Sequence, residues 1–213
     1  MAMIKILSNK KTLLVVLWMV FSIIPSVNAA QPSAQSSINK MIDAIKKYPS
    51  LEIGFSVWNN GNSISGSMNV AGKCFYLSTP DMQIWYDGKT QWSYAPSVGE
   101  VNITTPTAEE LAQSNPISIL SNLNSRFTFR RLKALTGEEK IELTPKKQTS
   151  DLASAILILD SSTSLPKGLS IKDSKSRITT IKISMLKGGK TMPASAYRFN
   201  SVAYPGVEIV DLR

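Results

Sequence analysis

The sequence offers little for nucleophilic or metal chemistry. Its 213 residues include no His and a single Cys, Cys74. Without His there is no Ser-His-Asp triad, no Cys-His dyad and no His-ligated metal site, and one Cys can form neither an internal disulfide nor a thiolate zinc site. Because Cys74 falls within a strand-like pattern, we expect a small, buried hydrophobic residue and not a reactive thiol.

Carboxylates could still act in pairs as acid and base, as in enzymes that cleave glycosidic bonds. All the candidates fall in turns or at strand ends, beside Ser, Gly or Lys, and none lies in an apolar stretch that would raise its pKa. They are Glu138, Glu139, Asp151, Asp160 and Asp173. We interpret them as solvated turn residues, and we predict no catalytic residue, no metal site, no cofactor and no enzymatic activity.

The first 29 residues have the pattern of a secretion signal. Three Lys precede an apolar run of 12 residues, Leu13 to Ile24, and small residues lead to a cleavage point near Ala29. That run is shorter than the roughly 20 residues that span a membrane, which favours a cleaved signal peptide over an anchor. We predict a signal peptide at residues 1–29, a single domain at residues 30–213 and a periplasmic location.

Removal of the three Lys of the signal lowers the formal net charge from +9 to +6. The remaining Lys and Arg are spread along the chain and do not alternate with aromatic residues at a spacing typical of nucleic-acid binding. We therefore expect no nucleic-acid partner. The surplus of positive charge would at most help the protein to approach anionic membranes or acidic partners.

Helical signals occur at two places in the remaining chain. Apolar residues recur at helical spacing from Ile38 to Ile45, with Ser36 or Ser37 as the N-cap. Later, Thr107-x-x-Glu110 forms a capping box and Asn115-Pro116 predicts the start of a second short helix. We expect these short helices to cover one face of a sheet.

The rest of the chain has the period-two pattern of antiparallel strands. The alternation begins at Leu51 and is interrupted by hairpin turns such as Asn60-Gly61 and Asp87-Gly88, where Gly accepts a positive φ. We count about ten or eleven strands on one meander, including pieces at 197–199 and 207–210, and a sheet of that size must curl or be covered. The fold class is mainly β with a few helices (α+β).

One stretch resembles a known family. The run Asp87-Gly88-Lys89-Thr90-x-Trp92-x-Tyr94-x-Pro96 is similar to the signature hairpin of the periplasmic outer-membrane lipoprotein carriers, the LolA family. Leu143-Thr144-Pro145-Lys146 and the tail from Phe199 to Asp211 resemble further family segments in the same order. The family's Arg-Pro pair has no counterpart in Val70-Ala71-Gly72-Lys73, so its Arg-held lid lock is not carried over.

The resemblance implies an incomplete, strongly curved antiparallel β-barrel with helices as a lid over an apolar cavity. It implies a monomeric carrier that shields the acyl chains of lipoproteins. The carrier would receive them from an inner-membrane ABC-type transporter and deliver them to an outer-membrane acceptor. A second interpretation is a lipid- or lipoprotein-sensing regulatory half-barrel, and a third is an enzyme that acts on envelope polymers.

The alternation of apolar and polar residues also predicts which side chains line the cavity. For the strands we choose Phe55, Val57, Met68, Val70, Phe75, Leu77, Ile84, Trp92 and Tyr94. For the lid we choose Leu111, Ile117 and Leu120. Adaptable Met side chains, at Met68, Met82 and Met185, suit a pocket for flexible chains.

Overall fold

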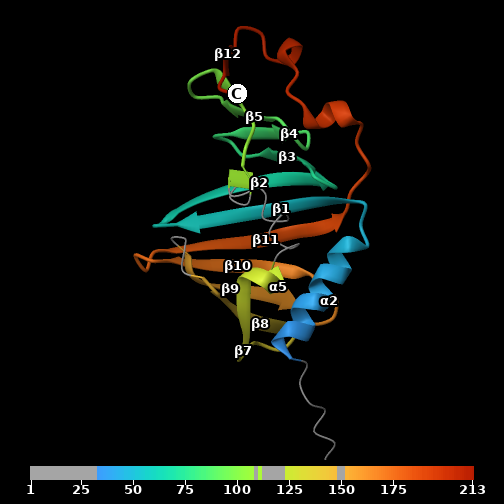
Figure 1. The fold of residues 1–213 in the computed structure, drawn as a ribbon, viewed down its shortest axis with the longest axis vertical. Helices are drawn as coiled ribbons and strands as arrows, with labels where there is room; N and C mark the ends of the chain where they lie inside the picture. Colours follow the sequence, from blue (N-terminus) through green and yellow to red (C-terminus); the bar gives the residue numbers. More distant parts are fainter. Residues whose placement is uncertain (1–32, 108–109, 112–122, 148–151) are drawn as a thin grey trace, which may run out of the picture. The chain divides into compact units, whose positions relative to one another are not determined.

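The computed structural model describes residues 33–107, 110–111, 123–147 and 152–213. Residues Ser33–Arg213 form one compact unit (Figure 1). The predicted signal peptide and the predicted helix at Asn115-Pro116 fall outside the described residues, so both stay predictions.

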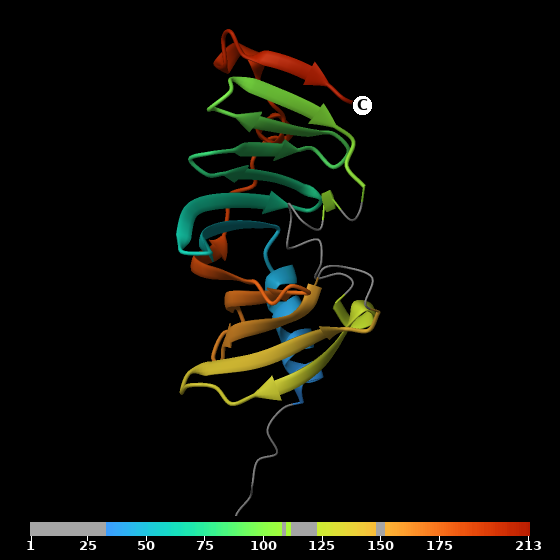
Figure 2. The same ribbon diagram turned by 90° about the vertical axis from the view of Figure 1, so that its left-hand side faces the viewer.

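A single sheet of twelve strands dominates this unit, one or two more than predicted. The sheet is open, since its order runs from β12 at one edge to β7 at the other, and Figure 2 shows the strands stacked in that order. The strands are β1 (Ser50–Asn59), β2 (Asn62–Ala71), β3 (Cys74–Ser78), β4 (Gln83–Tyr86), β5 (Gln91–Ala95), β6 (Glu100–Thr104), β7 (Phe127–Leu132), β8 (Glu138–Pro145), β9 (Leu152–Asp160), β10 (Pro166–Asp173), β11 (Ile178–Gly188) and β12 (Glu208–Asp211).

The strand order corrects the expectation of a single meander. The order is β12-β6-β5-β4-β3-β2-β1-β11-β10-β9-β8-β7, so β1 pairs with β11 and joins two separate meanders. β6 and β7 follow one another in the numbering but lie far apart in the sheet, with β6 next to β12 and β7 at the opposite edge. β12 is parallel to β6, so the sheet is not wholly antiparallel. The predicted strand at 197–199 is wrong, because residues Ala194–Tyr197 form the short 3-10 helix η1.

A β-bulge interrupts the pairing of β1 with β11. Gly54 lies opposite Met185, whereas the next residue, Phe55, lies opposite Ile183, so Ser184 is an extra residue. A bulge reverses the alternation locally and bends the strand. Met185 therefore leaves the face that Ile183 occupies and is 41% exposed, contrary to its predicted place in the pocket. Met82 is also exposed, and of the three Met residues only Met68 is buried.

Helix α2 (Ala34–Lys46) packs against one face of the sheet, which we call the inner face. Its apolar stripe of Ile38, Met41 and Ile45 is buried, as the helical spacing predicted. The N-cap is Ser33, whose hydroxyl accepts a hydrogen bond from the backbone N–H of Ser36 at 3.1 Å, and not Ser36 or Ser37. Figure 1 shows α2 crossing the part of the sheet formed by β7 to β11, beside the short helix α5 (Leu123–Arg126).

The apolar side of the sheet changes from one face to the other near β4. From β7 to β4 in sheet order, the inner face carries the main core. At β4 both faces are covered, since Ile84, Trp85 and Tyr86 are all buried. On β5 the residues in register with the inner positions of β4 are Gln91 and Ser93, so the inner face becomes polar there.

The opposite, outer face of β3 to β6 is covered by the C-terminal segment. The ring of Trp85 packs against Phe199 and Tyr204, with centroids 5.4 and 5.7 Å apart. The Tyr204 hydroxyl donates to Oε1 of Gln83 at 2.6 Å. The segment contains η1 and the second 3-10 helix η2 (Ser201–Ala203), and it ends in β12, so it closes a second, smaller core.

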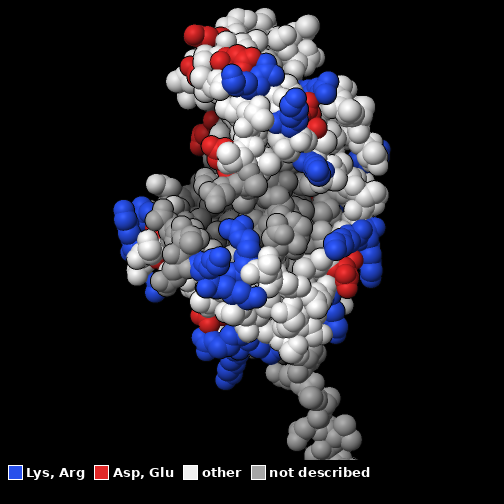
Figure 3. Space-filling view, in the orientation of Figure 1, with Lys and Arg blue, Asp and Glu red and all other residues white. Residues whose placement is uncertain are grey.

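On the face that Figure 3 shows, Lys and Arg side chains cover more of the surface than Asp and Glu side chains. The three acidic residues of β8 each pair with a basic neighbour. Glu138 pairs with Lys167, Glu139 with Arg131 and Glu142 with Arg130. These carboxylates therefore do not offset the charge of other Lys and Arg residues at the surface.

Candidate lipid-binding site

The inner face is a continuous apolar surface that extends over most of the sheet. Its β1 residues Leu51 and Ile53 lie opposite Val70 and Met68 of β2, and β3 continues the row with Phe75. On the other side of β1, the β8 residues Ile141 and Leu143 and the β9 residues Leu157 and Leu159 belong to the same core cluster. Long, flexible acyl chains require an apolar surface of this kind.

Several apolar side chains of this face are only partly buried although they pack against the core. Such positions can gain free energy by covering further apolar surface, at about 25 cal/mol per Å². They belong to both meanders of the sheet. They are Phe55, Leu77, Phe129, Leu169, Ile171 and Ile183.

Six of the nine predicted cavity residues lie in this inner core. Met68, Val70, Phe75 and Ile84 are buried in it, whereas Phe55 and Leu77 are partly buried against it. Val57 has the same strand parity and lies in register with Ile64 and Ile181, near the end of β1. The structure places these residues on one face. Their contact with a lipid stays a prediction.

Trp92 and Tyr94 do not lie on this face, which corrects their grouping with Ile84. Their register partners on β4 are Trp85 and Gln83, and Trp85 points to the outer face. Tyr94 packs there against Tyr204, with ring centroids 5.0 Å apart. Both aromatics share a face, as the alternation predicted. The sequence alone could not show that the apolar side of the sheet changes at β4.

Among the predicted lid residues, Leu111 packs against the inner core. The predicted capping box is present, because the backbone N–H of Thr107 donates to Oε2 of Glu110 at 2.7 Å and the Glu110 N–H donates to Oγ1 of Thr107 at 3.3 Å. Ile117 and Leu120 lie outside the described residues. Their role in the lid therefore stays a prediction.

A hydrogen-bonded ion pair joins α2 to the β7–β8 hairpin. Nη2 of Arg131 donates to Oγ of Ser37 at 2.6 Å and to Oε2 of Glu139 at 3.0 Å. Ser37 is buried, and the side chains of Arg131 and Glu139 are 22% and 21% exposed. This contact was not predicted from the sequence, where Glu139 was interpreted as a solvated turn residue.

A second polar contact holds α2 next to α5. Nε2 of Gln35 donates to Oδ1 of Asn124 at 2.7 Å, and Nδ2 of Asn124 donates to Oδ1 of Asn39 at 3.1 Å. These exposed amide bonds are individually weak. A helix held by a few polar contacts and one apolar stripe can move more easily than one that is buried on all sides.

Close packing at Gly66 shapes the inner face beside Phe55. A Cβ at position 66 would lie 2.7 Å from Cζ of Phe55 and 2.6 Å from the backbone oxygen of Ser78. Only Gly leaves room for the ring, so the Phe55 side chain lies across β2 at this point. The ring thereby fills the gap that the missing side chain leaves in the sheet.

Asp87 and Gly88 form a structural turn, as predicted. Gly88 has φ +97°, and Oδ1 of Asp87 accepts hydrogen bonds from the N–H groups of Lys89 and Thr90. Burial would raise the pKa of Asp87, but the backbone hydrogen bonds from Thr90 and Lys89 and the nearby Arg198 guanidinium outweigh it, so the pKa lies below its ordinary value. Nε of Arg198 lies 3.0 Å from Oδ2 of Asp87 and so holds the C-terminal segment on the hairpin.

Cys74 lies on β3 and is half-buried. Burial, reinforced by the charge of Asp87, raises the pKa of its thiol. A thiol with a raised pKa is a poor nucleophile at neutral pH. The environment thus agrees with a packing role.

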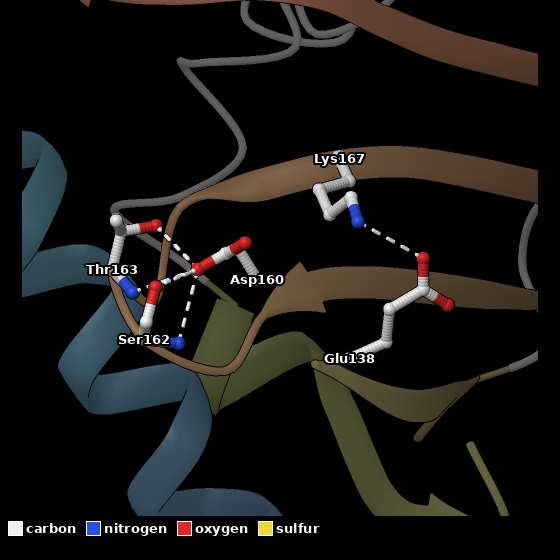
Figure 4. Close-up of polar contacts among 5 residues, drawn as sticks. All are labelled: Glu138, Asp160, Ser162, Thr163 and Lys167. Atoms are coloured by element: carbon white, nitrogen blue, oxygen red, sulfur yellow. Dashed lines mark hydrogen bonds and ion pairs between the residues drawn. The ribbon is translucent and has the colours of Figure 1, made fainter. Parts of the chain in front are cut away.

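Figure 4 shows two of the carboxylates considered for acid–base catalysis, Asp160 and Glu138, which are the last residue of β9 and the first residue of β8 and not turn residues as predicted. Oδ1 of Asp160 accepts hydrogen bonds from both the hydroxyl and the N–H of Ser162 and of Thr163, and these bonds lower its pKa. Glu138 pairs with Lys167 at 3.1 Å. A general acid at neutral pH needs a raised pKa, which is the opposite of the shift at Asp160. Asp151 lies outside the described residues.

The described part of the chain contains no cluster of His, Cys, Asp and Glu residues able to hold a metal ion. In the same part of the chain, none of the helices is long and apolar enough to cross a bilayer.

The chain is similar to several solved structures. An uncharacterized conserved protein from Thermus thermophilus matches with a TM-score of 0.58 at 10% identity, over 84% of this chain and 98% of that one. A DUF1329 family protein from Desulfovibrio piger matches at a TM-score of 0.49 and 12% identity, over 82% and 100% of the two chains. A LolA superfamily protein from Nitrosomonas europaea matches at 0.43 and 12%, over 79% and 98%.

No curated protein matches the sequence. The sequence model of one family, described as the outer membrane lipoprotein carrier protein LolA, matches residues 31–177, which is most of the chain and includes the strands from β1 to β10. The open, curved sheet with α2 over its inner face agrees with this match. The chain therefore belongs to the family of outer membrane lipoprotein carrier proteins.

Proposed function

We propose that this protein binds the acyl chains of lipoproteins against its inner face and carries them through the periplasm from the inner to the outer membrane. The observation that supports the proposal best is the set of apolar side chains, such as Phe55 and Ile183, that pack against the inner core and are only partly buried. In this role the protein binds and releases its cargo without covalent chemistry.

The energy of acyl-chain transfer explains why such a carrier needs this surface. An acyl chain has on the order of 15 methylenes, and each contributes about 0.8 kcal/mol when it leaves water. A single chain in water is therefore unfavourable by on the order of 10 kcal/mol. A transfer protein must offset most of that cost while still releasing the chain, which favours an adaptable apolar face over a rigid, filled core.

The proposed partners follow from this role. Cargo would come from an ABC-type lipoprotein-releasing transporter in the inner membrane, and an acceptor at the outer membrane would take it. Predicted cleavage near Ala29 would deliver the carrier to the periplasm. The protein would act as a monomer, because one inner face is sufficient for the acyl chains.

The test is the release of lipoproteins from spheroplasts by the purified mature protein. We expect labelled lipoproteins to appear in the supernatant as a complex with the carrier. Leu77→Ser makes a partly buried inner position polar and should reduce release several-fold. Ile156→Ser is the matched control, because Ile156 lies half-buried on the outer face of β9, in register with Glu142 and Ser170.

Failure of the wild-type protein to release any lipoprotein would contradict the proposal. Equal loss in Leu77→Ser and Ile156→Ser would also contradict it, since the inner face would then have no special role. Co-purification with a membrane-bound anti-sigma protein, without any acylated cargo, would instead favour the sensing half-barrel.

A further inference from the structure

One end of the sheet carries a concentration of basic side chains, which we call the basic rim. β7 and β11 begin at this end, and β8 and β10 finish there, as the pairs Phe127↔Pro145 and Lys172↔Ile178 show. All the rim side chains are exposed, and the described residues place a single acid among them, Asp173. The rim consists of Arg126, Lys146, Lys147, Lys172, Lys175 and Arg177.

Most of the rim charge has no carboxylate partner among the residues that the structure describes. Arg177 pairs with Asp173 at 2.6 Å. Lys146 donates to the backbone oxygen of Asn124 at 2.9 Å, which leaves its charge uncompensated. Figure 3 shows these charges as two groups of basic side chains, one around α5 and one at the β10–β11 turn. The opposite end of the same strands is mixed, because Glu138 and Lys167 pair there.

Two large apolar side chains are exposed next to the rim, on the outer face. Trp58 is 41% exposed near the end of β1, and Ile178 is 54% exposed at the start of β11. Ile178 lies directly opposite Lys172 of the rim. Trp58 lies opposite Thr180, two residues from Ile178, so the two apolar side chains are diagonal neighbours.

We propose that the basic rim, together with Trp58 and Ile178, docks the protein on the surface of an anionic phospholipid bilayer. Lys and Arg near an anionic leaflet are attracted to it, and Trp prefers the interface between headgroups and acyl chains. The Lys side chains would contact the anionic headgroups, and the exposed Trp would enter the interface below them. An acidic protein would be attracted by the Lys side chains alone. This inference goes beyond cargo binding, because neither the rim residues nor Trp58 and Ile178 belong to the inner core.

Docking at this end has a consequence for transfer. Val57 and Ile64 are paired at the same end of β1 and β2, on the inner face. A bilayer in contact with the rim would therefore lie close to this end of the inner face. An acyl chain that passes between the bilayer and the inner face would then cross a short distance in water.

The experiment is co-flotation of the mature protein with vesicles of equal parts phosphatidylglycerol and phosphatidylcholine, compared with phosphatidylcholine alone. The rim variant is Lys146→Gln/Lys147→Gln/Lys175→Gln. The matched control, Lys73→Gln/Lys89→Gln/Lys190→Gln, removes the same charge from exposed positions outside the rim. We expect binding only to the anionic vesicles, a loss of about tenfold or more in the rim variant, and little change in the control. Trp58→Ser should also weaken binding.

The proposal is wrong if wild-type protein shows no preference for anionic vesicles, whether or not an acidic protein binds it instead. It is also wrong if the control variant loses as much affinity as the rim variant, because net charge alone would then explain the binding. Uptake of an acylated lipopeptide in vesicle-free solution separates this proposal from the carrier function. The rim variant should keep this uptake, whereas Leu77→Ser should lose it and still bind the vesicles.

Discussion

Arg131 of β7 donates a hydrogen bond of 2.6 Å to the buried hydroxyl of Ser37, 94 residues earlier in the chain. The same guanidinium pairs with Glu139, so one side chain fixes α2 to the β7–β8 hairpin. Its neighbour Arg130 makes an ion pair of similar length with Glu142, but the Arg130 side chain is 71% exposed. The two Arg residues therefore differ mainly in burial and in the contact with α2.

This difference predicts unequal effects of two neighbouring substitutions. Arg131→Ala should lower the free energy of unfolding by about 1–3 kcal/mol, because it leaves the buried Ser37 and the partly buried Glu139 without their shared donor. Arg130→Ala should change it by less than about 1 kcal/mol, since exposed ion pairs contribute little. Urea denaturation measures both values. Equal effects would show that Arg131 does not hold α2 in place.

Gly66 should be intolerant of any side chain. In Gly66→Ala the new Cβ would overlap the Phe55 ring and the backbone oxygen of Ser78, and the strand cannot move away from both. We expect a loss of about 1–3 kcal/mol in the free energy of unfolding. Ser67→Ala, at the adjacent exposed position, should stay within about 0.5 kcal/mol of the wild type. A Gly66→Ala protein as stable as Ser67→Ala would contradict the packing described here.

The aromatic cluster on the outer face should act on stability and not on cargo. Trp85→Ala removes a buried ring that contacts Tyr76, Phe199 and Tyr204. It should lower the free energy of unfolding by about 3–5 kcal/mol. Tyr204→Phe loses only the hydrogen bond to Gln83. It should lower the free energy of unfolding by about 0.5–1.5 kcal/mol. Thermal unfolding of the two variants and the wild type measures both losses of stability. A strong loss of lipopeptide binding in folded Tyr204→Phe would show that the outer cluster takes part in binding.

The ion pair between Asp87 and Arg198 predicts a dependence of stability on acid pH. The pKa of Asp87 is lowered below its ordinary value of 3.8, so the folded state holds this proton less tightly than the unfolded state. The resulting stabilisation is present above pH 3.8 and is lost as the pH falls through the lower pKa of the folded state. Asp87→Asn should flatten the acid limb of the curve of stability against pH. An unchanged acid limb would rule out this role of Asp87.

The sequence predicted most elements because their signals are local. The alternation from Leu51 and the turn at Asp87-Gly88 depend on neighbouring residues alone, and the buried stripe of α2 follows from its helical spacing. Two features depend on contacts between distant segments and could not be predicted. The pairing of β1 with β11 places a bulge at Ser184, which exposes Met185, and the C-terminal segment packs on the outer face against Tyr94.

The candidate site was predicted only where local signals in the sequence are sufficient. Parity placed Phe55, Met68 and Phe75 on one face correctly, because the side chains of a regular strand alternate. The half of the inner face that β7 to β10 form was missed, although Ile141 and Leu143 show the same alternation. The role of Arg131 depends on its contact with Ser37, which no local pattern in the sequence indicates.

The central claim is that acyl chains lie against the inner face, and site-specific photocrosslinking tests it most directly. A photoreactive phenylalanine derivative is placed at Phe55 on the inner face or at Trp92 on the outer face, and each protein is irradiated with a triacylated lipopeptide. We predict crosslinks to the acyl chains from position 55 and none from position 92. Crosslinks from position 92 alone, or equally from both positions, would contradict this account.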